Sequence, residues 1–113
     1  MSVTRKLTIR QKEIEKYLFE IGFCPELAGF EILRECIYVA SKDKDKYRKS
    51  VSQVLFEEVK ERLGKSSVRA IETGIRYIRE RCVNPKYHSK KIKQLIFLII
   101  TELGYSYAIL WRD

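Results

Sequence analysis

Apolar residues recur at helical spacing along most of the chain, and only five glycines and two prolines interrupt the pattern. A first helix is predicted over residues 8–21, because its apolar side chains form one stripe and Gly22 offers a stop. A second helix is predicted from Pro25, which a first helical turn tolerates, to Ser41. Residues 42–46 alternate in charge sign, which predicts a solvated connector.

The helical spacing continues in the middle of the chain. A third helical region is predicted over residues 47–63, either as one helix or as two short helices broken near Phe56. Gly64 is expected to end this region, because glycine accepts the conformation that closes a helix. A serine then caps a further helix over residues 67–82, which Pro85 prevents from continuing.

The last predicted helix covers residues 89–104, although the apolar run at 95–100 also fits a buried strand. The segment after it is aromatic and either packs on the core or forms a dimer surface. Its aromatic residues are Tyr105, Tyr107 and Trp111. Together these patterns predict one all-α domain over residues 1–113, a compact bundle of about five to six helices.

The helix predicted over residues 67–82 has two different faces. At 100° per residue its apolar side chains fall within about 80° of one another, and polar side chains lie opposite. The apolar stripe consists of Val68, Ile71, Ile75, Ile78 and Cys82, and the polar face of Arg69, Thr73, Arg76 and Glu80, flanked by Glu72 and Arg79. Gly74 borders the stripe, where a missing side chain lets another backbone approach closely. With the short amphipathic helix before it, this helix predicts a helix–turn–helix over residues 56–82, whose second helix enters a DNA major groove.

The distribution of charge favours the same interpretation. The chain has 23 basic and 15 acidic residues, a net charge of +8. Residues 65–93 alone hold nine basic and two acidic residues, a net charge of +7, so the rest of the chain is nearly balanced. A local excess of this size on a small domain favours a polyanionic partner, with nucleic acid first and an anionic membrane surface second.

Two groups of side chains are candidates for contact with double-stranded DNA. Arginine can bind guanine in the major groove, glutamate can accept a hydrogen bond from cytosine, and threonine can meet a thymine methyl group or a phosphate. The candidates for groove contact are Arg69, Glu72, Thr73 and Arg76. The candidates for phosphate contact, which supply affinity and register, are Lys65, Ser66, Ser67, Arg79, Lys86, Lys90 and Lys91. For the lysines after Pro85, plain solvation is an equally good interpretation.

The sequence gives little support for membrane insertion, secretion, catalysis or metal binding. The longest apolar run is far shorter than the roughly 18 residues of a membrane span, and the N-terminus lacks the apolar region of a signal peptide. His88, the only histidine, lies in a polar stretch and is predicted at the surface rather than in a catalytic site. Three cysteines without a CxxC pair suit a reducing cytosol; Cys36 and Cys82 are predicted to be buried, and Cys24 borders a turn. We therefore expect a cytoplasmic protein that is not an enzyme and uses no cofactor, metal or small-molecule substrate.

Several short segments resemble a known family of DNA-binding domains. The chain is similar, over about residues 14–82, to the C-terminal effector domain of the stage-zero sporulation response regulator of endospore-forming Firmicutes. The matching elements are Glu20-Ile21-Gly22, Pro25, Gly29-Phe30, Leu33-Arg34-Glu35, Ser50-Val51, Val54-Leu55-Phe56, Val59 and Ile71-Glu72-x-x-Ile75-Arg76. The resemblance implies an all-helical fold with a helix–turn–helix, and a role in sporulation and transcription regulation in which tandem domains, here a homodimer, occupy adjacent DNA boxes.

The resemblance also shapes the alternatives. The chain has no room for a receiver domain, so a stand-alone effector-like protein is expected. Glu72 and Arg76 match polar positions of the family's recognition helix, whereas the family has arginine where this chain has Ala70 and Thr73. This difference motivates a second hypothesis, a helical protein–protein interaction module that kept the fold but not the DNA specificity. RNA binding is a third and weaker hypothesis, because no exposed aromatic stacking platform is evident.

Overall fold

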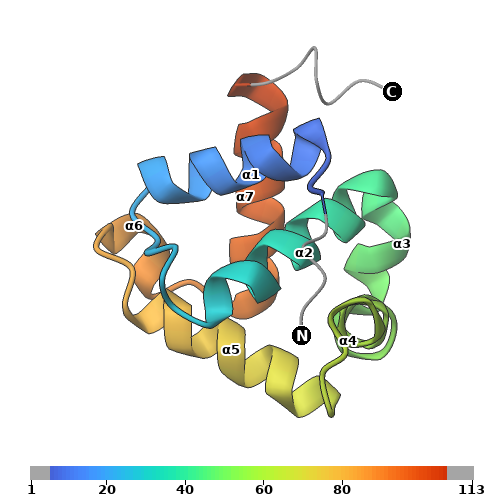
Figure 1. The fold of residues 1–113 in the computed structure, drawn as a ribbon. Coiled ribbons are helices and arrows are strands. Elements are labelled where there is room, and N and C mark those ends of the chain that lie inside the picture. Colours follow the sequence, from blue (N-terminus) through green and yellow to red (C-terminus); the bar gives the residue numbers. More distant parts are fainter. Residues whose placement is uncertain (1–5, 107–113) are drawn as a thin grey trace.

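The computed structural model describes residues 6–106, and these residues confirm the all-α class (Figure 1). The described part contains seven α-helices and one π-helical segment, rather than the predicted five to six helices. The elements are α1 (Ile9–Glu20), α2 (Gly29–Lys42), α3 (Lys44–Lys49), η1 (Val51–Leu55), α4 (Phe56–Leu63), α5 (Val68–Glu80), α6 (Pro85–His88) and α7 (Ile92–Ser106). None of the described helices has the length and apolar character needed to span a membrane.

Helix α1 confirms the first predicted helix at both ends. Thr8 is its N-cap: the Thr8 hydroxyl accepts a hydrogen bond from the Gln11 backbone N–H (3.0 Å). The Gln11 side chain in turn accepts one from the Thr8 backbone N–H (2.9 Å), which completes a capping box. The chain then reverses at Gly22, whose φ of +110° is a conformation that glycine adopts without strain.

Two predicted boundaries around α2 are wrong. The helix begins at Gly29 instead of Pro25, because the preceding residues form turns in which Leu27 bonds back to Cys24 (3.2 Å). The predicted connector at 42–46 is also largely helical, since α3 begins at Lys44. The Asp43 side chain accepts a hydrogen bond from the Lys46 backbone N–H and so caps α3.

The third predicted region is broken, but at Ser50 rather than near Phe56. Ser50 separates α3 from η1, and η1 passes directly into α4 at Phe56. The last helix begins at Ile92 rather than at residue 89 and passes Gly104, and its apolar run is helical rather than a strand. A short separate helix, α6, begins at Pro85 after the cap formed by Asn84.

The aromatic tail predicted from the sequence lies outside the described residues. The backbone is described to Ser106, and Tyr107 and Trp111 lie beyond it. The side chain of Tyr105 is likewise not among the described ones. The two roles predicted for the aromatic tail, in core packing or in a dimer surface, therefore stay predictions.

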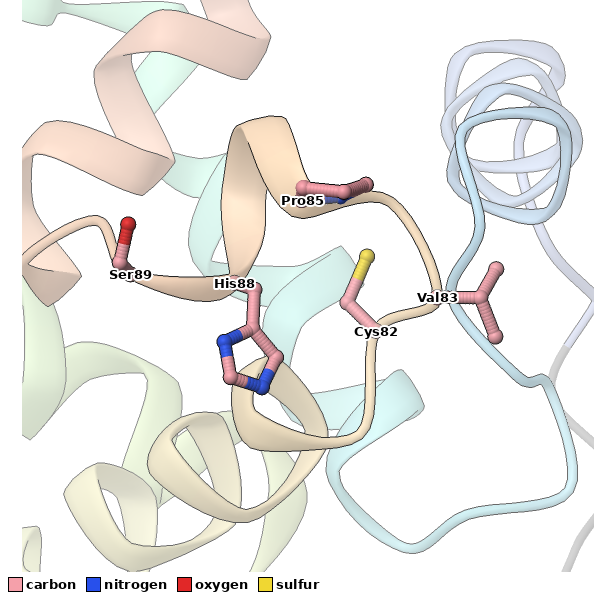
Figure 2. Close-up of a pocket in the computed structure, with 5 residues that line it drawn as sticks. All are labelled: Cys82, Val83, Pro85, His88 and Ser89. Atoms are coloured by element: carbon pink, nitrogen blue, oxygen red, sulfur yellow. The ribbon is translucent and has the colours of Figure 1, made fainter.

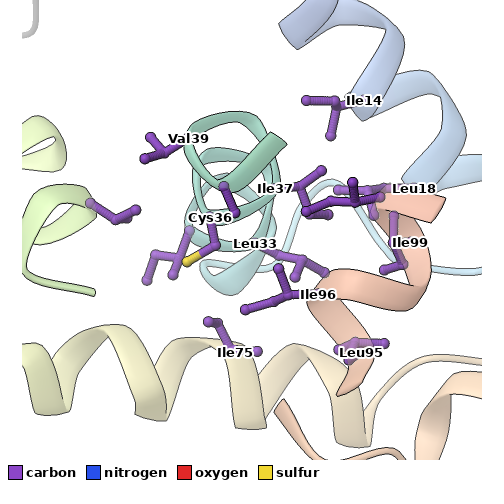
Figure 3. Packing of buried hydrophobic residues seen from close by; sticks show 14 of the residues in the cluster. Ile14, Leu18, Leu33, Cys36, Ile37, Val39, Ile75, Leu95, Ile96 and Ile99 are labelled. Atoms are coloured by element: carbon purple, nitrogen blue, oxygen red, sulfur yellow. The ribbon is translucent and has the colours of Figure 1, made fainter. Parts of the chain in front are cut away.

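Helix α2 lies at the centre of the hydrophobic core, and helices from both halves of the chain pack against it (Figure 3). Leu33 and Ile37 of α2 meet side chains of α1, α5 and α7, among them Leu18, Ile75 and Ile96. All five of these side chains are fully buried. Because burial of one such side chain stabilises the fold by about 2 kcal/mol, α2 fixes the positions of the helices around it.

The cysteines behave as small apolar residues, as the sequence predicted. Cys36 and Cys82 are buried, whereas Cys24 is half-buried beside the turn before α2. Burial raises the pKa of both the Cys36 and the Cys82 thiol, so each stays protonated at neutral pH.

A buried carboxylate, Glu35, joins α2 to α1 and α4. One oxygen of Glu35 accepts hydrogen bonds from Gln11 Nε2 (2.7 Å) and Arg34 Nε (3.0 Å), and the other accepts one from Arg62 Nε (2.9 Å). Arg34 also donates to Glu15 (2.8 Å). The Glu35 side chain is only 2% exposed, so these bonds compensate for its lost hydration. The network fixes α4 relative to α2.

A second carboxylate, Glu102, joins α7 to α1 and α6. Glu102 accepts hydrogen bonds from the hydroxyls of Tyr17 (2.9 Å) and Tyr87 (2.6 Å) and forms an ion pair with Lys86. Burial raises the pKa of Glu102, but the hydrogen bonds from Lys86, Tyr87 and Tyr17 outweigh burial and leave this pKa below its usual value.

Candidate nucleic-acid interface

The predicted turn between residues 63 and 68 is present, and both of its signals act as expected. Gly64 ends α4 in the left-handed conformation (φ +65°), and its N–H and that of Lys65 bond back to the last turn of α4. Ser67 is the N-cap of α5, and its hydroxyl accepts a hydrogen bond from the Ala70 N–H (3.1 Å). Figure 1 shows α4 end-on while α5 runs across the view, so the two helices meet at a steep angle.

The inner face of α5 is the apolar stripe that the sequence predicted. Ile71, Ile75 and Ile78 are fully buried. At Gly74 the backbones of α5 and α2 come close: an ideal Cβ built on Gly29 would lie 2.1 Å from the Gly74 carbonyl oxygen. The close approach predicted at Gly74 is thus confirmed, and α2 is the helix that makes it. The two glycines and the isoleucine stripe together fix which face of α5 points outward.

The outward face of α5 carries the predicted groove residues. Arg69, Thr73 and Arg76 are exposed, while Glu72 is half-buried at the edge of this face. Within the described part of the chain, none of these four side chains takes part in an ion pair or a side-chain hydrogen bond. Arg69 and Arg76 are two turns apart, about 10 Å along the helix axis. The face therefore presents two uncompensated guanidinium groups with a hydroxyl between them.

Some basic side chains elsewhere in the fold are paired with acidic residues. Arg34 and Arg62 form ion pairs with Glu35, and Lys60 forms one with Glu57 (3.1 Å). These acidic residues neutralise cations of the scaffold, and no described acidic residue does so for the arginines on the outward face of α5. The outward face of α5 therefore carries two unpaired arginines within the segment 65–93, which holds most of the chain's excess positive charge.

The turn before α5 adds further polar groups at the N-terminal end of the helix. Lys65 and Ser66 are exposed, and Ser67 is half-buried because its hydroxyl accepts the capping bond. The Ala70 N–H is taken by the Ser67 cap, but the backbone N–H groups of the two residues before it have no partner within the helix and lie at its positive end. Such a helix end, with a lysine and two serines beside it, suits a phosphate.

The basic residues after α5 divide into two groups. Lys86 is held in the ion pair with Glu102, so the structure does not bring it to the outward face of α5. Lys90 is half-buried and Lys91 is exposed, in the loop between α6 and α7. This loop is attached to α5 because Arg79 Nη1 donates a hydrogen bond to the Lys90 carbonyl oxygen (2.9 Å). The Arg79 side chain therefore faces the loop rather than solvent.

Two residues at the C-terminal end of α5 were not singled out from the sequence. Arg81 stacks on the exposed ring of Tyr77, with its guanidinium carbon 3.7 Å from the ring centroid. Arg81 Nη1 also donates to the Tyr77 carbonyl oxygen (3.1 Å). The spacing of four residues between an aromatic and a basic residue on one helix was the available signal.

His88 is exposed, as the sequence predicted, and lines a shallow open depression of about 380 Å³ (Figure 2). Its other lining residues are Cys82, Val83, Pro85 and Ser89. In the described part of the chain, no three histidine, cysteine, aspartate or glutamate side chains are grouped so that they could hold a metal ion. The depression thus offers one imidazole, one hydroxyl and a buried thiol, with no carboxylate beside them.

The chain was compared with protein-family models, with curated proteins and with solved structures, and none of the three comparisons found a match.

Proposed function

We propose that the chain is a sequence-specific DNA-binding transcriptional regulator whose helix α5 lies in the major groove. The observation that supports this most directly is the outward face of α5, where Arg69, Thr73 and Arg76 are exposed and have no ion pair or side-chain hydrogen bond among the described residues, on a helix that packs closely against α2. Unpaired arginines at this spacing can bind guanine edges, and Thr73 can contact a thymine methyl group. The steep α4–α5 arrangement with its short turn supports the proposal, because helix–turn–helix proteins join two helices by a short turn at a large angle.

The residues around α5 receive supporting roles in this proposal. Glu72, at the edge of the face, either accepts a hydrogen bond from cytosine or orients Arg76. Lys65, Ser66 and Ser67 at the N-terminal end of α5 contact the phosphate backbone, where they give affinity without sequence information. No residue has a catalytic role, and the protein acts in the cytoplasm as a regulator of the sporulation type that its sequence resembles, as a monomer or as a homodimer on tandem sites.

A selection of bound duplexes from a random DNA pool tests this proposal. We expect enrichment of one short motif, and binding to the enriched duplex that weakens steeply as salt increases, because displaced counterions return to the DNA. Equal recovery of all sequences would show that the face of α5 does not read bases. The absence of any duplex binding at low salt would refute the proposal altogether.

A specific observation also favours the second candidate function, a helical module that binds another protein. Phe19 of α1 is 64% exposed and Val83, after α5, is 82% exposed. The Val83 N–H donates to the Gly22 carbonyl (3.2 Å), which places Val83 beside the turn that follows α1. Exposed apolar side chains are common in protein interfaces, so a protein partner is the interpretation that remains if duplex DNA is not bound.

A further inference from the structure

The outward face of α5 has a cation on each of its two flanks. At 100° per residue, Arg79 lies about 60° to one side of Arg76, and Tyr77, on which Arg81 stacks, lies about 100° to the other side. Each of these flanks is held in place by a contact to the backbone, whereas Arg69 and Arg76 between them form no ion pair with any described residue. Glu72 and Glu80 lie on the same side of the helix, so the two flanks add cations on either side of a face that carries charges of both signs.

On the first flank, Arg79 supports the loop between α6 and α7. Its Nη1 bonds to the Lys90 carbonyl, while its Nη2 is 3.8 Å from Glu80, a weak ion pair. The Nε of Arg79 is buried and has no partner within the described residues. Because a buried donor without a partner is unfavourable, this side chain is a poor choice for stability alone. Its evident effect is to hold Lys90 and Lys91 beside α5.

On the second flank, Tyr77 supports Arg81. The guanidinium of Arg81 is stacked on the ring and bonded to the Tyr77 carbonyl, so both its position and its orientation are restrained. Its other N–H groups are free to donate, since Arg81 is exposed. A cation restrained in this way loses less conformational entropy when it binds an anion than a free side chain does.

We propose that these two flanks contact the phosphates of opposite DNA strands: Lys90 and Lys91 on one strand, and Arg81 on the other. Arg79 and Tyr77 are then positioning residues that do not touch DNA themselves. The inference rests on the proposed function and deepens it. An α-helix with its side chains is about 10–12 Å across and the major groove is about 12 Å wide, so a helix in the groove has one strand along each flank.

The salt dependence of binding tests the contribution of each flank, with the duplex enriched from the random pool as the probe. Lys91→Ala and Arg81→Ala should each reduce the slope of log affinity against log salt by about 1. Arg79→Met should reduce it as well, but should add nothing in a chain that already carries Lys90→Ala and Lys91→Ala, because Arg79 acts through this loop. The matched control is Lys44→Ala on α3, which removes the same charge away from α5 and should leave the slope nearly unchanged.

Neutral methylphosphonate groups, placed one at a time along each strand, test the assignment to strands. A neutral group at a contacted phosphate should weaken binding of the unmodified protein. In Lys91→Ala this weakening should disappear for groups on one strand only, and in Arg81→Ala it should disappear for groups on the other strand only. The double lysine variant keeps Arg79 in place, so it tests the loop even if Arg79→Met unfolds the protein.

Three results would overturn the inference. The first is an unchanged slope of log affinity against log salt in the double lysine variant. The second is that Lys91→Ala and Arg81→Ala both abolish the weakening by neutral groups on the same strand. The third is an additive effect of Arg79→Met in the double lysine chain, which would mean that Arg79 contacts DNA itself. All three differ from a failure of the proposed function, in which the unmodified protein binds no duplex and this inference falls with it.

Discussion

Replacement of Gly29 by alanine should destabilise the protein far more than the same replacement at Gly74, although both glycines lie at one helix crossing. An ideal Cβ on Gly29 would lie 2.1 Å from the Gly74 carbonyl oxygen, which is 1.3 Å short of the 3.4 Å at which ordinary contact begins. The obstacle is backbone, so α2 and α5 must move apart and loosen the isoleucines between them. An ideal Cβ on Gly74 instead meets the Cδ1 atom of Ile32 at 2.4 Å. This atom is the end of a flexible side chain and can rotate away.

The magnitudes follow from these contacts. Forcing an extra methyl group into a packed core costs about 1–3 kcal/mol, and Gly29→Ala belongs at the upper end because helices must separate. Gly74→Ala gains about 1 kcal/mol of helix propensity, which offsets a rotamer change in Ile32 of about 0.5–1.5 kcal/mol. We therefore expect a loss of about 3 kcal/mol for Gly29→Ala and a change near zero for Gly74→Ala.

Urea denaturation followed by circular dichroism measures both free energies of unfolding. The Gly74→Ala variant is the matched control, because it adds the same methyl group at the same crossing. Equal stabilities of the two variants would refute the reasoning, since they would mean that α2 and α5 do not approach through Gly29. An unchanged stability of Gly29→Ala would do so by itself.

Three further predictions concern buried polar groups. Glu35→Ala should lower the free energy of unfolding by about 3–5 kcal/mol in urea denaturation, because Arg34 and Arg62 lose their buried partner. The pKa of Glu102 is lower in the folded state than in the unfolded chain. Ionised Glu102 therefore contributes its full share of the folding free energy above about pH 4.5, and this share is lost as the pH falls through the folded-state pKa. Glu102→Gln should therefore weaken the loss of stability at acid pH. Burial and the hydrogen bond to a neighbouring glutamate raise the pKa of Tyr47 to about 12, so stability should fall between pH 10 and about pH 12, and Tyr47→Phe should remove that fall in the same titration. A Glu35→Ala variant as stable as the unmodified protein would contradict the first prediction. An unchanged loss of stability at acid pH in Glu102→Gln, or at alkaline pH in Tyr47→Phe, would contradict the other two.

Local signals in the sequence predicted much of the helical framework. Thr8 and Gly22 bound α1, Gly64 ends α4 and Ser67 caps α5, because each signal acts through residues within a few positions of itself. The two faces of α5 were also predictable, since helical periodicity alone separates them. Even the close approach at Gly74 was visible as a gap beside an apolar stripe.

The errors arose where a local turn or cap was not recognised, or where distant residues decide the structure. Pro25 permits a helix start, but turns that lead to the buried Gly29 delay it. The alternating charges after Ser41 suggested a connector, yet capping by Asp43 and burial of Tyr47 make most of that segment helical. Periodicity also could not reveal that Arg79 bonds to Lys90, because this contact depends on how the α6–α7 loop folds back.

The central claim is that the outward face of α5 reads DNA sequence, and Arg76→Ala tests it most directly. The measurement is the ratio of affinities for the enriched duplex and for a duplex of scrambled sequence, taken at one salt concentration for the unmodified protein, for Arg76→Ala and for Lys44→Ala. We predict that Arg76→Ala lowers this discrimination by about 1–3 kcal/mol while Lys44→Ala preserves it. Unchanged discrimination in a folded Arg76→Ala protein would contradict the claim.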